Sequence, residues 1–141
     1  MAGAQEQGLK LLGPGTGVSM YTIRVQMALR IKGLSYDYLP EDPWRKSELL
    51  LASNPVHKKL PVLIHAGRPV CESLIIVQYL DDAFAGNSTS ILPTDPYSRA
   101  VARFWASYID DKVCFLSFGL SLESRSCICW CCLLAAPLLP Y

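Results

Sequence analysis

The alternation of apolar and polar positions predicts short strands and helices over the first 86 residues. Short apolar runs bounded by turn residues predict strands, and longer segments with apolar residues three or four positions apart predict helices. The expected strands cover residues 8–13, 35–39, 60–65 and 69–72. The expected helices cover residues 20–32, 46–53 and 73–84. The predicted order of elements is therefore β-α-β-α-β-β-α.

The first of these helices has recognisable ends. Ser19 is a residue type that accepts hydrogen bonds from the first free backbone N–H groups of a helix, and Gly33 is a common helix stop. Between them, Ile23, Met27 and Ile31 recur at helical spacing. This spacing predicts an amphipathic helix whose apolar face these three side chains form.

The element order predicts the fold class. A βαβ unit followed by a ββα unit is the thioredoxin-like arrangement, in which the crossover between the parallel strands is right-handed. The tight turn at 66–69 joins strands 60–65 and 69–72 as an antiparallel hairpin. We therefore expect an α/β domain over residues 7–86 with a mixed four-stranded sheet.

A polar linker and one more helix are expected after this domain. Residues 87–95 are polar, and Pro96 suits the first turn of a helix. The helix is expected to cover residues 96–112. Its expected inward side chains are those of Val101, Phe104, Trp105, Tyr108 and Ile109.

The composition changes abruptly at Val113. Beyond it only Glu123 and Arg125 are charged, and five of the six cysteines lie there, four of them at Cys127, Cys129, Cys131 and Cys132. We expect residues 113–141 to be a poorly ordered, apolar, cysteine-rich tail, such as a translated intron or frameshift. The cysteines follow a C-x-C-x-C-C pattern without histidine or a second cluster, so we predict no metal site.

Charge and hydropathy exclude several classes of partner. The net charge of +1 gives no global field that favours nucleic acid. The mean hydropathy is +0.24, yet no apolar run approaches the ~20 residues of a membrane span. The first ten residues lack the apolar core of a signal peptide. We therefore expect a cytoplasmic protein with reduced cysteines, no membrane span and no nucleic-acid partner.

The segment 54–73 carries most of the candidate chemistry. Pro61 begins a strand, and a cis Leu60–Pro61 bond would turn the Leu60 backbone toward an extended ligand. Glu72 and Ser73 stand where a strand meets a helix, so the first backbone N–H groups form a small anion site. A carboxylate at that site and an ammonium at Glu72 together suit an α-amino acid head group.

Three lysines and one serine are candidates for binding the other parts of such a ligand. A carboxylate at the far end of such a ligand can bind Lys46, Lys58 and Lys59. At the start of the first helix, the Ser19 hydroxyl can donate to a ligand thiolate and lower the thiol pKa from its usual ~8.5. No histidine lies near Ser19 in sequence to make it a nucleophile.

Each candidate also has a purely structural interpretation. Ser19 and Ser73 can be helix caps, and Pro61 can begin its strand with a trans bond. Single lysines are more often solvated surface charges than ligands. Two familiar motifs are missing, because the glycines before Ser19 do not form G-x-G-x-x-G and no C-x-x-C occupies the first turn.

Taken together, these segments resemble one family. Residues 9–112 are similar to the plant tau-class glutathione transferases. The resemblance lies in RVQMALRIKGLSYDY, NPVHKKLPVLIHAGRPVCESLIIVQYLDDAF and LPTDPYSRAVARFWASYIDDK. The Glu-Ser pair and the proline-started hairpin are shared by most glutathione transferases, whereas NPVHKK and ESLIIVQY are more specific to tau members.

The resemblance implies an enzyme that joins glutathione to hydrophobic electrophiles in detoxification. Ser19 matches the catalytic serine that stabilises the glutathione thiolate. Glutathione is then a co-substrate, a small hydrophobic electrophile is the second substrate, and no further cofactor is implied. The family is homodimeric.

The resemblance also implies how glutathione lies. Lys46 and Lys59 would hold the glycine carboxylate. The backbone of Leu60, before the family's cis-proline at Pro61, would pair with the cysteinyl part. The γ-glutamyl head would lie at Glu72–Ser73.

Two departures from the family keep other interpretations open. Tau members usually read W-A-S-P-F around the serine, and this chain has Gly17-Val18-Ser19-Met20-Tyr21. Family members also continue with several more helices, which supply the electrophile pocket and part of the dimer interface. The alternatives are a non-catalytic glutathione-binding fragment and an inactive product of a mis-spliced or disrupted gene.

Overall fold

A computed structural model describes residues 8–42, 44–86 and 89–119, with side chains described as far as residue 112. The chain divides into two units, of which the first ends at Ile91 and the second begins at Leu92. Each unit is described by itself.

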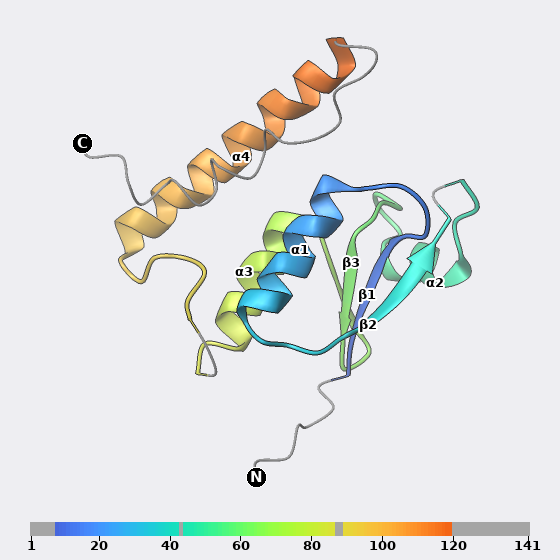
Figure 1. The fold of residues 1–141 in the computed structure, drawn as a ribbon, viewed down its shortest axis with the longest axis horizontal. Helices are drawn as coiled ribbons and strands as arrows, with labels where there is room; N and C mark the ends of the chain where they lie inside the picture. Colours follow the sequence, from blue (N-terminus) through green and yellow to red (C-terminus); the bar gives the residue numbers. More distant parts are fainter. Residues whose placement is uncertain (1–7, 43, 87–88, 120–141) are drawn as a thin grey trace. The chain divides into compact units, whose positions relative to one another are not determined.

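The first unit is a four-stranded mixed sheet with helices on both faces (Figure 1). The strand order is β2-β1-β3-β4, with β1 parallel to β2 and with β3 antiparallel to both β1 and β4. Helices α1 and α3 cover one face, and α2 covers the other. This architecture confirms the predicted thioredoxin-like α/β class. Its elements are β1 (Leu9–Pro14), α1 (Met20–Ile31), β2 (Asp37–Glu41), α2 (Glu48–Ser53), β3 (Val62–His65), β4 (Arg68–Cys71) and α3 (Ser73–Ala83).

Neighbouring side chains of the central strands enter opposite cores. Leu11 and Leu63 pack with α1 and α3, while Leu12 and Val62 pack against Leu50 of α2. All four strand residues are 0% exposed. Because side chains alternate across a sheet, a strand that is covered on both faces reads as a continuous apolar run.

The apolar face predicted for α1 is wrong. The buried face consists of other residues, and Ile31 from the predicted face is 43% exposed. The buried face mixes apolar with polar side chains, and this mixture hides its helical period. Its members are Thr22, Arg24, Val25, Ala28 and Leu29.

The second strand begins two residues later than predicted. Tyr36 packs beside the α1–α3 core, but pairing with β1 starts only at Asp37, which lies opposite Lys10. The Tyr36 side chain therefore packs against the core although its backbone is not yet paired with β1. The hairpin at β3 and β4 forms as predicted, with His65 opposite Arg68.

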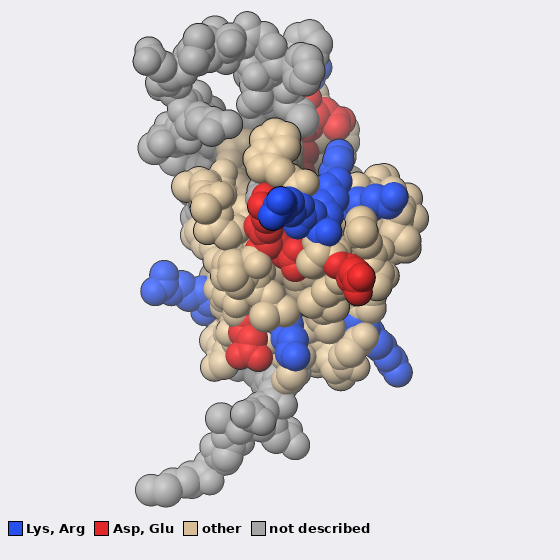
Figure 2. All heavy atoms as spheres, turned by 90° about the vertical axis from the view of Figure 1, so that its right-hand side faces the viewer, with Lys and Arg blue, Asp and Glu red and all other residues tan. Residues whose placement is uncertain are grey.

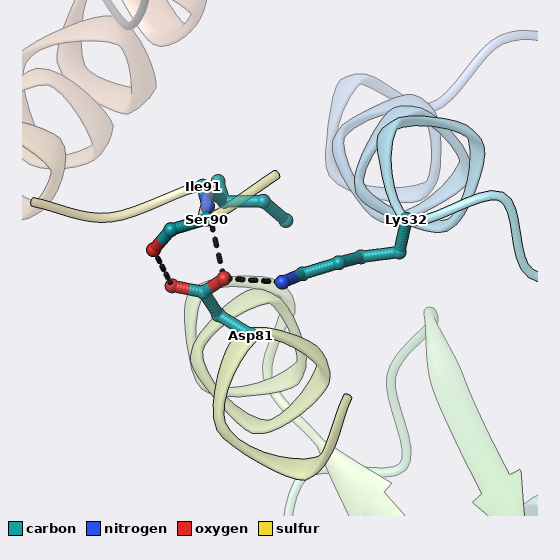
Figure 3. Close-up of polar contacts among 4 residues, drawn as sticks. All are labelled: Lys32, Asp81, Ser90 and Ile91. Carbon is teal, nitrogen blue, oxygen red and sulfur yellow. Dashed lines mark hydrogen bonds and ion pairs between the residues drawn. The ribbon is translucent and has the colours of Figure 1, made fainter. Parts of the chain in front are cut away.

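A buried ion pair joins α1, α3 and the predicted linker (Figure 3). The Lys32 ammonium lies 2.7 Å from Asp81 Oδ1, and the two side chains are 0% and 2% exposed. The same carboxylate accepts hydrogen bonds from the Ser90 hydroxyl at 3.3 Å and the Ile91 N–H at 2.9 Å. Residues 90 and 91 are therefore held on the first unit rather than forming free linker.

The second unit contains one helix, α4 (Pro96–Gly119), among its described residues. The predicted end at residue 112 is wrong, because no glycine or proline interrupts the chain before Gly119. The expected inward placement of its aromatics is also not found: Phe104, Trp105 and Tyr108 are 60%, 38% and 45% exposed and contact one another. The rest of the predicted tail, residues 120–141, lies outside the described residues.

None of the helices in the described ranges has the length and apolar character that crossing a membrane requires.

Candidate functional site

The sheet register brings the candidate residues to one edge. Leu12 of β1 lies opposite Val62 of β3, which lies opposite Cys71 of β4. The next positions at that edge are the loop that leads to Ser19, the Leu60–Pro61 bond that precedes β3, and the Glu72–Ser73 junction that follows β4. Segments that are distant in sequence therefore converge on one site.

Ser19 is the N-cap of α1. Its backbone is extended (φ −113°, ψ 118°), and its hydroxyl oxygen accepts a hydrogen bond from the Thr22 N–H at 3.4 Å. This distance is longer than an ordinary N–H···O bond. The hydroxyl proton is not used by the cap, so Ser19 can donate to an anion at the positive end of the helix.

The loop before Ser19 is anchored to β2 at two points. The Tyr38 hydroxyl donates to the Pro14 carbonyl at 2.9 Å, and the Gly15 N–H donates to the Glu41 carbonyl at 2.8 Å. Burial, followed by the effect of neighbouring Tyr36, raises the pKa of Tyr38, which keeps its hydroxyl protonated as a donor. The sequence of this loop differs from the one that tau members usually have, but its two hydrogen bonds to β2 hold its backbone in place.

Gly13 leaves room for this anchor. A Cβ at residue 13 would collide with the Tyr38 hydroxyl and would lie 2.8 Å from the Thr22 methyl. At Gly86, by contrast, a Cβ would meet no atom within 4 Å. Glycine at 13 is therefore required by the close approach of Tyr38 and α1, not by a turn.

We expect Gly13→Ala to destabilise the first unit by about 1–3 kcal/mol, because overpacking displaces well-packed neighbours. Chemical denaturation measures this difference. The matched control is Gly86→Ala, which adds the same methyl group to open space and should stay within about 0.5 kcal/mol of the parent chain. Equal stability of the two variants would contradict the close packing at Gly13.

The junction after β4 holds a strained backbone. Glu72 has φ +69° and ψ 118°, a conformation that non-glycine residues rarely adopt, and its side chain is exposed. It occupies the N-cap position of α3 without a side-chain cap hydrogen bond. Such strain concentrates at ligand sites, where the surrounding structure maintains it. Glu72 therefore lies, exposed, beside the N-terminus of α3.

Ser73 is the first residue of α3, so its interpretation as the helix cap is wrong. The residue is 5% exposed, and its hydroxyl oxygen accepts a hydrogen bond from Arg24 Nη1 at 2.7 Å. Arg24 is itself 9% exposed, and its guanidinium lies 5.7 Å from the centre of the Tyr21 ring. A buried cation therefore fixes the hydroxyl on which an anionic head group would depend.

The loop between α2 and β3 is organised by Asn54, which is 3% exposed. Its side-chain amide donates to the Lys59 carbonyl at 3.1 Å and accepts from the His57 N–H at 3.1 Å. The backbone carbonyl of Asn54 accepts a hydrogen bond from the Lys58 N–H at 2.9 Å. One buried amide thus sets the path of the NPVHKK segment up to Leu60.

The Leu60–Pro61 peptide bond is cis, so the trans interpretation is wrong. Pro61 is buried and Leu60 is half-buried. Pairing with the neighbouring strands begins at Val62, and Leu60 therefore precedes the ladder. Its backbone lies at the sheet edge where an extended ligand can run beside it.

The candidate lysines are exposed. Lys46 directly precedes Ser47, the N-cap of α2, and Lys59 follows the same helix. Figure 2 looks onto the side where α2 lies and shows Lys and Arg side chains gathered together there. The binding of a ligand carboxylate by Lys46 and Lys59 therefore stays a prediction.

Cys71, the last residue of β4, lies at this edge of the sheet. Cys71 donates a hydrogen bond to the Ser53 carbonyl at 3.4 Å. Burial and the neighbouring charge of Glu72 raise the pKa of Cys71, which keeps the sulfur protonated. Since the thiolate is the nucleophilic form, this raised pKa disfavours Cys71 as a nucleophile.

The comparisons with known proteins agree with this arrangement. The family description "Glutathione S-transferase, N-terminal domain" matches residues 15–88. The chain therefore belongs to the glutathione S-transferase family.

The relatives place it with the tau class, as the sequence predicts. It is 59% identical over 116 residues to the probable glutathione S-transferase GSTU6 of rice, covering 80% of this chain and 48% of the relative. It is 57% identical over 106 residues to glutathione S-transferase U18 of Arabidopsis thaliana, covering 75% and 46%. The chain spans about half the length of the curated relatives it matches.

Solved structures show the same likeness. Rice GST1, crystallised in complex with glutathione, is 52% identical with a TM-score of 0.72, over 77% of this chain and 49% of that chain. The tau-class enzyme MiGSTU from mango is 43% identical with a TM-score of 0.73, over 94% and 57%.

Three buried residues at or near the site were not predicted. Arg24, Asn54 and Glu41 are polar residues in segments that otherwise read as ordinary surface or loop. Of the three, only Asn54 could have been recognised from the sequence. An Asn before a Pro favours a turn in which the Asn side chain hydrogen-bonds to the backbone of the turn. Nothing in the sequence distinguishes Arg24 from a solvated arginine.

Proposed function

We propose that this chain binds glutathione at the edge of the sheet and transfers its thiolate to a small hydrophobic electrophile. The observation that carries the proposal is the convergence of the Ser19 loop, the cis Leu60–Pro61 bond and the Glu72–Ser73 junction on one edge. The similar rice structure, which was crystallised with glutathione, supports the choice of ligand.

The γ-glutamyl head binds at the α3 junction in this proposal. Its carboxylate accepts hydrogen bonds from Ser73 and the first N–H groups of α3, where the helix dipole favours an anion. Its ammonium pairs with the exposed carboxylate of Glu72. Arg24, through its hydrogen bond to Ser73, keeps that hydroxyl oriented.

The remaining parts of glutathione follow the sheet edge in this proposal. The cysteinyl backbone pairs with Leu60 in the manner of an added strand. The glycine carboxylate binds Lys46 and Lys59. The thiol then lies toward Ser19 at the start of α1.

The reaction needs a thiolate at neutral pH. Ser19 donates a hydrogen bond to the sulfur, and the N-terminus of α1 adds its partial positive charge, so both lower the thiol pKa. The thiolate then attacks the electrophilic carbon and forms a carbon–sulfur bond. Either a leaving group departs with its bonding electron pair, or the π electrons of a double bond shift to a neighbouring atom of the electrophile and the resulting anion takes a proton from water. Detoxification of such electrophiles in the cytoplasm, without a further cofactor, is part of the proposal.

Two assays on the purified chain test the proposal. We expect retention on immobilised glutathione, elution by free glutathione, and turnover of a generic aryl halide. Retention without turnover would reject catalysis and select a glutathione-binding fragment. Neither retention nor turnover would overturn the proposal and would match an inactive product.

A further inference from the structure

Glu41 is a buried carboxylate to which neither the family resemblance nor the proposed function assigns a role. It is the last residue of β2 and is 7% exposed. It lies at the same edge of the sheet as the proposed glutathione site, because Pro14, the last residue of β1, is its partner in the ladder. A carboxylate is costly to bury unless hydrogen bonds compensate it.

The Glu41 side chain holds the segment that carries Lys46. Its Oε1 accepts a hydrogen bond from the Ser47 hydroxyl at 2.8 Å. The Ser47 oxygen in turn accepts from the Leu50 N–H at 3.1 Å and caps α2. Leu50 is 1% exposed in the core beneath α2, so this chain of contacts ends at a rigid point.

The Glu41 backbone holds the opposite side of the site. Its carbonyl accepts the Gly15 N–H at 2.8 Å, within the loop that leads to Ser19. A Cβ at Gly15 would lie 3.3 Å from the Pro40 side chain, so this loop runs close against the end of β2. One residue thus contacts both the loop of the thiol side and the segment of the carboxylate side.

We propose that Glu41 is a positioning residue that places Lys46 against the glycine carboxylate of glutathione, an inference that rests on the proposed function. Glu41 acts through the Ser47 hydroxyl and does not touch the ligand. The backbone contact to Gly15 survives any side-chain substitution, so the side chain can be tested separately from the Ser19 loop.

The test compares glutathione with its glycine monoethyl ester, in which a neutral ethyl ester replaces the charged carboxylate that Lys46 would bind. Isothermal titration calorimetry measures both dissociation constants. We expect Glu41→Ala to weaken glutathione binding by about tenfold, as loss of one charge-assisted hydrogen bond predicts. Binding of the ester should change by less than about twofold.

Two substitutions separate the hydrogen bond from the charge. Glu41→Gln keeps an oxygen that can accept from Ser47, so its loss of affinity should be much smaller than that of Glu41→Ala. Glu48→Gln removes an exposed charge from the first turn of the same helix and should leave both affinities unchanged. An equal loss in Glu41→Gln and Glu41→Ala would show a charge effect and overturn the positioning role.

Ser47→Ala breaks the same hydrogen bond from the other side and replaces Glu41→Ala if that variant does not fold. It should show the same selective loss for glutathione over the ester. An equal loss for both ligands in either variant would overturn the inference.

Lys46→Ala distinguishes failure of the inference from failure of the proposed function. If Lys46→Ala weakens glutathione selectively and Glu41→Ala does not, only the inference fails. If the unsubstituted chain binds no glutathione, or binds acid and ester equally, the proposed function fails at this end of the site and the inference fails with it.

Discussion

Replacing Ser19 with alanine is expected to lower kcat/KM for glutathione conjugation about 100-fold, the effect of removing one donor aimed at developing negative charge. Ser19 begins α1, and its hydroxyl proton is not used by the helix cap. Under the proposed function it is the side-chain donor nearest the sulfur. Removing it leaves only the helix dipole to favour the thiolate.

The loss should depend on pH in a defined direction. A donor to the thiolate lowers the thiol pKa below its usual ~8.5, so the parent chain holds more of the bound thiol as thiolate near neutral pH than Ser19→Ala does. In Ser19→Ala the pKa of the bound thiol rises back toward that value. The rate difference should therefore be largest near pH 6–7 and should shrink above about pH 9, where both sulfurs are ionised. Ultraviolet absorbance of the bound thiolate measures the same shift without turnover.

Two further substitutions separate the donor from the cap. Ser19→Thr keeps both the hydroxyl and the cap and should retain much of the activity. Ser19→Gly removes the hydroxyl but destabilises a helix start by only a few tenths of a kcal/mol. If Ser19→Gly is as active as the parent chain, Ser19 is a cap and not a catalytic residue.

The fold was predictable because its signals are local. The apolar runs, the turn at 66–69 and the prolines gave the order and type of every element in the first unit. The predicted boundaries were less exact where a side chain packs against the core but its residue is not paired in the sheet, as for Tyr36. The extent of α4 was missed because a compositional break at Val113 is not a helix stop.

The candidate site was only partly predictable. The residues proposed to contact the ligand, such as Ser19 and Glu72, stand at element ends, where sequence patterns are informative. Their supporting residues are buried polar groups whose partners are distant in sequence, as Arg24 and Ser73 are by 49 positions. No periodicity encodes such a pair, because a buried arginine and an exposed one satisfy the same polar position of a helical pattern.

The buried pair of Lys32 and Asp81 illustrates the same limit and leads to the largest expected effect on stability. We expect Asp81→Ala to destabilise the first unit by about 3–5 kcal/mol, because breaking a buried ion pair leaves an uncompensated charge. The Lys32 side chain is 0% exposed. Within the described residues, no hydrogen bond other than this ion pair reaches its ammonium. Chemical denaturation measures the difference, which is a large part of the 5–15 kcal/mol that stabilises a typical domain.

The double variant Lys32→Met with Asp81→Asn tests whether the stranded ammonium is the cause. It removes both charges but keeps a side-chain oxygen that can accept the Ile91 N–H, which would otherwise be left unpaired. Replacing a buried ion pair by uncharged groups of similar size is often neutral, so the double variant should be clearly more stable than Asp81→Ala. Equal destabilisation in both would show that the stranded ammonium is not the cause and that the attraction between the two charges itself stabilises the unit.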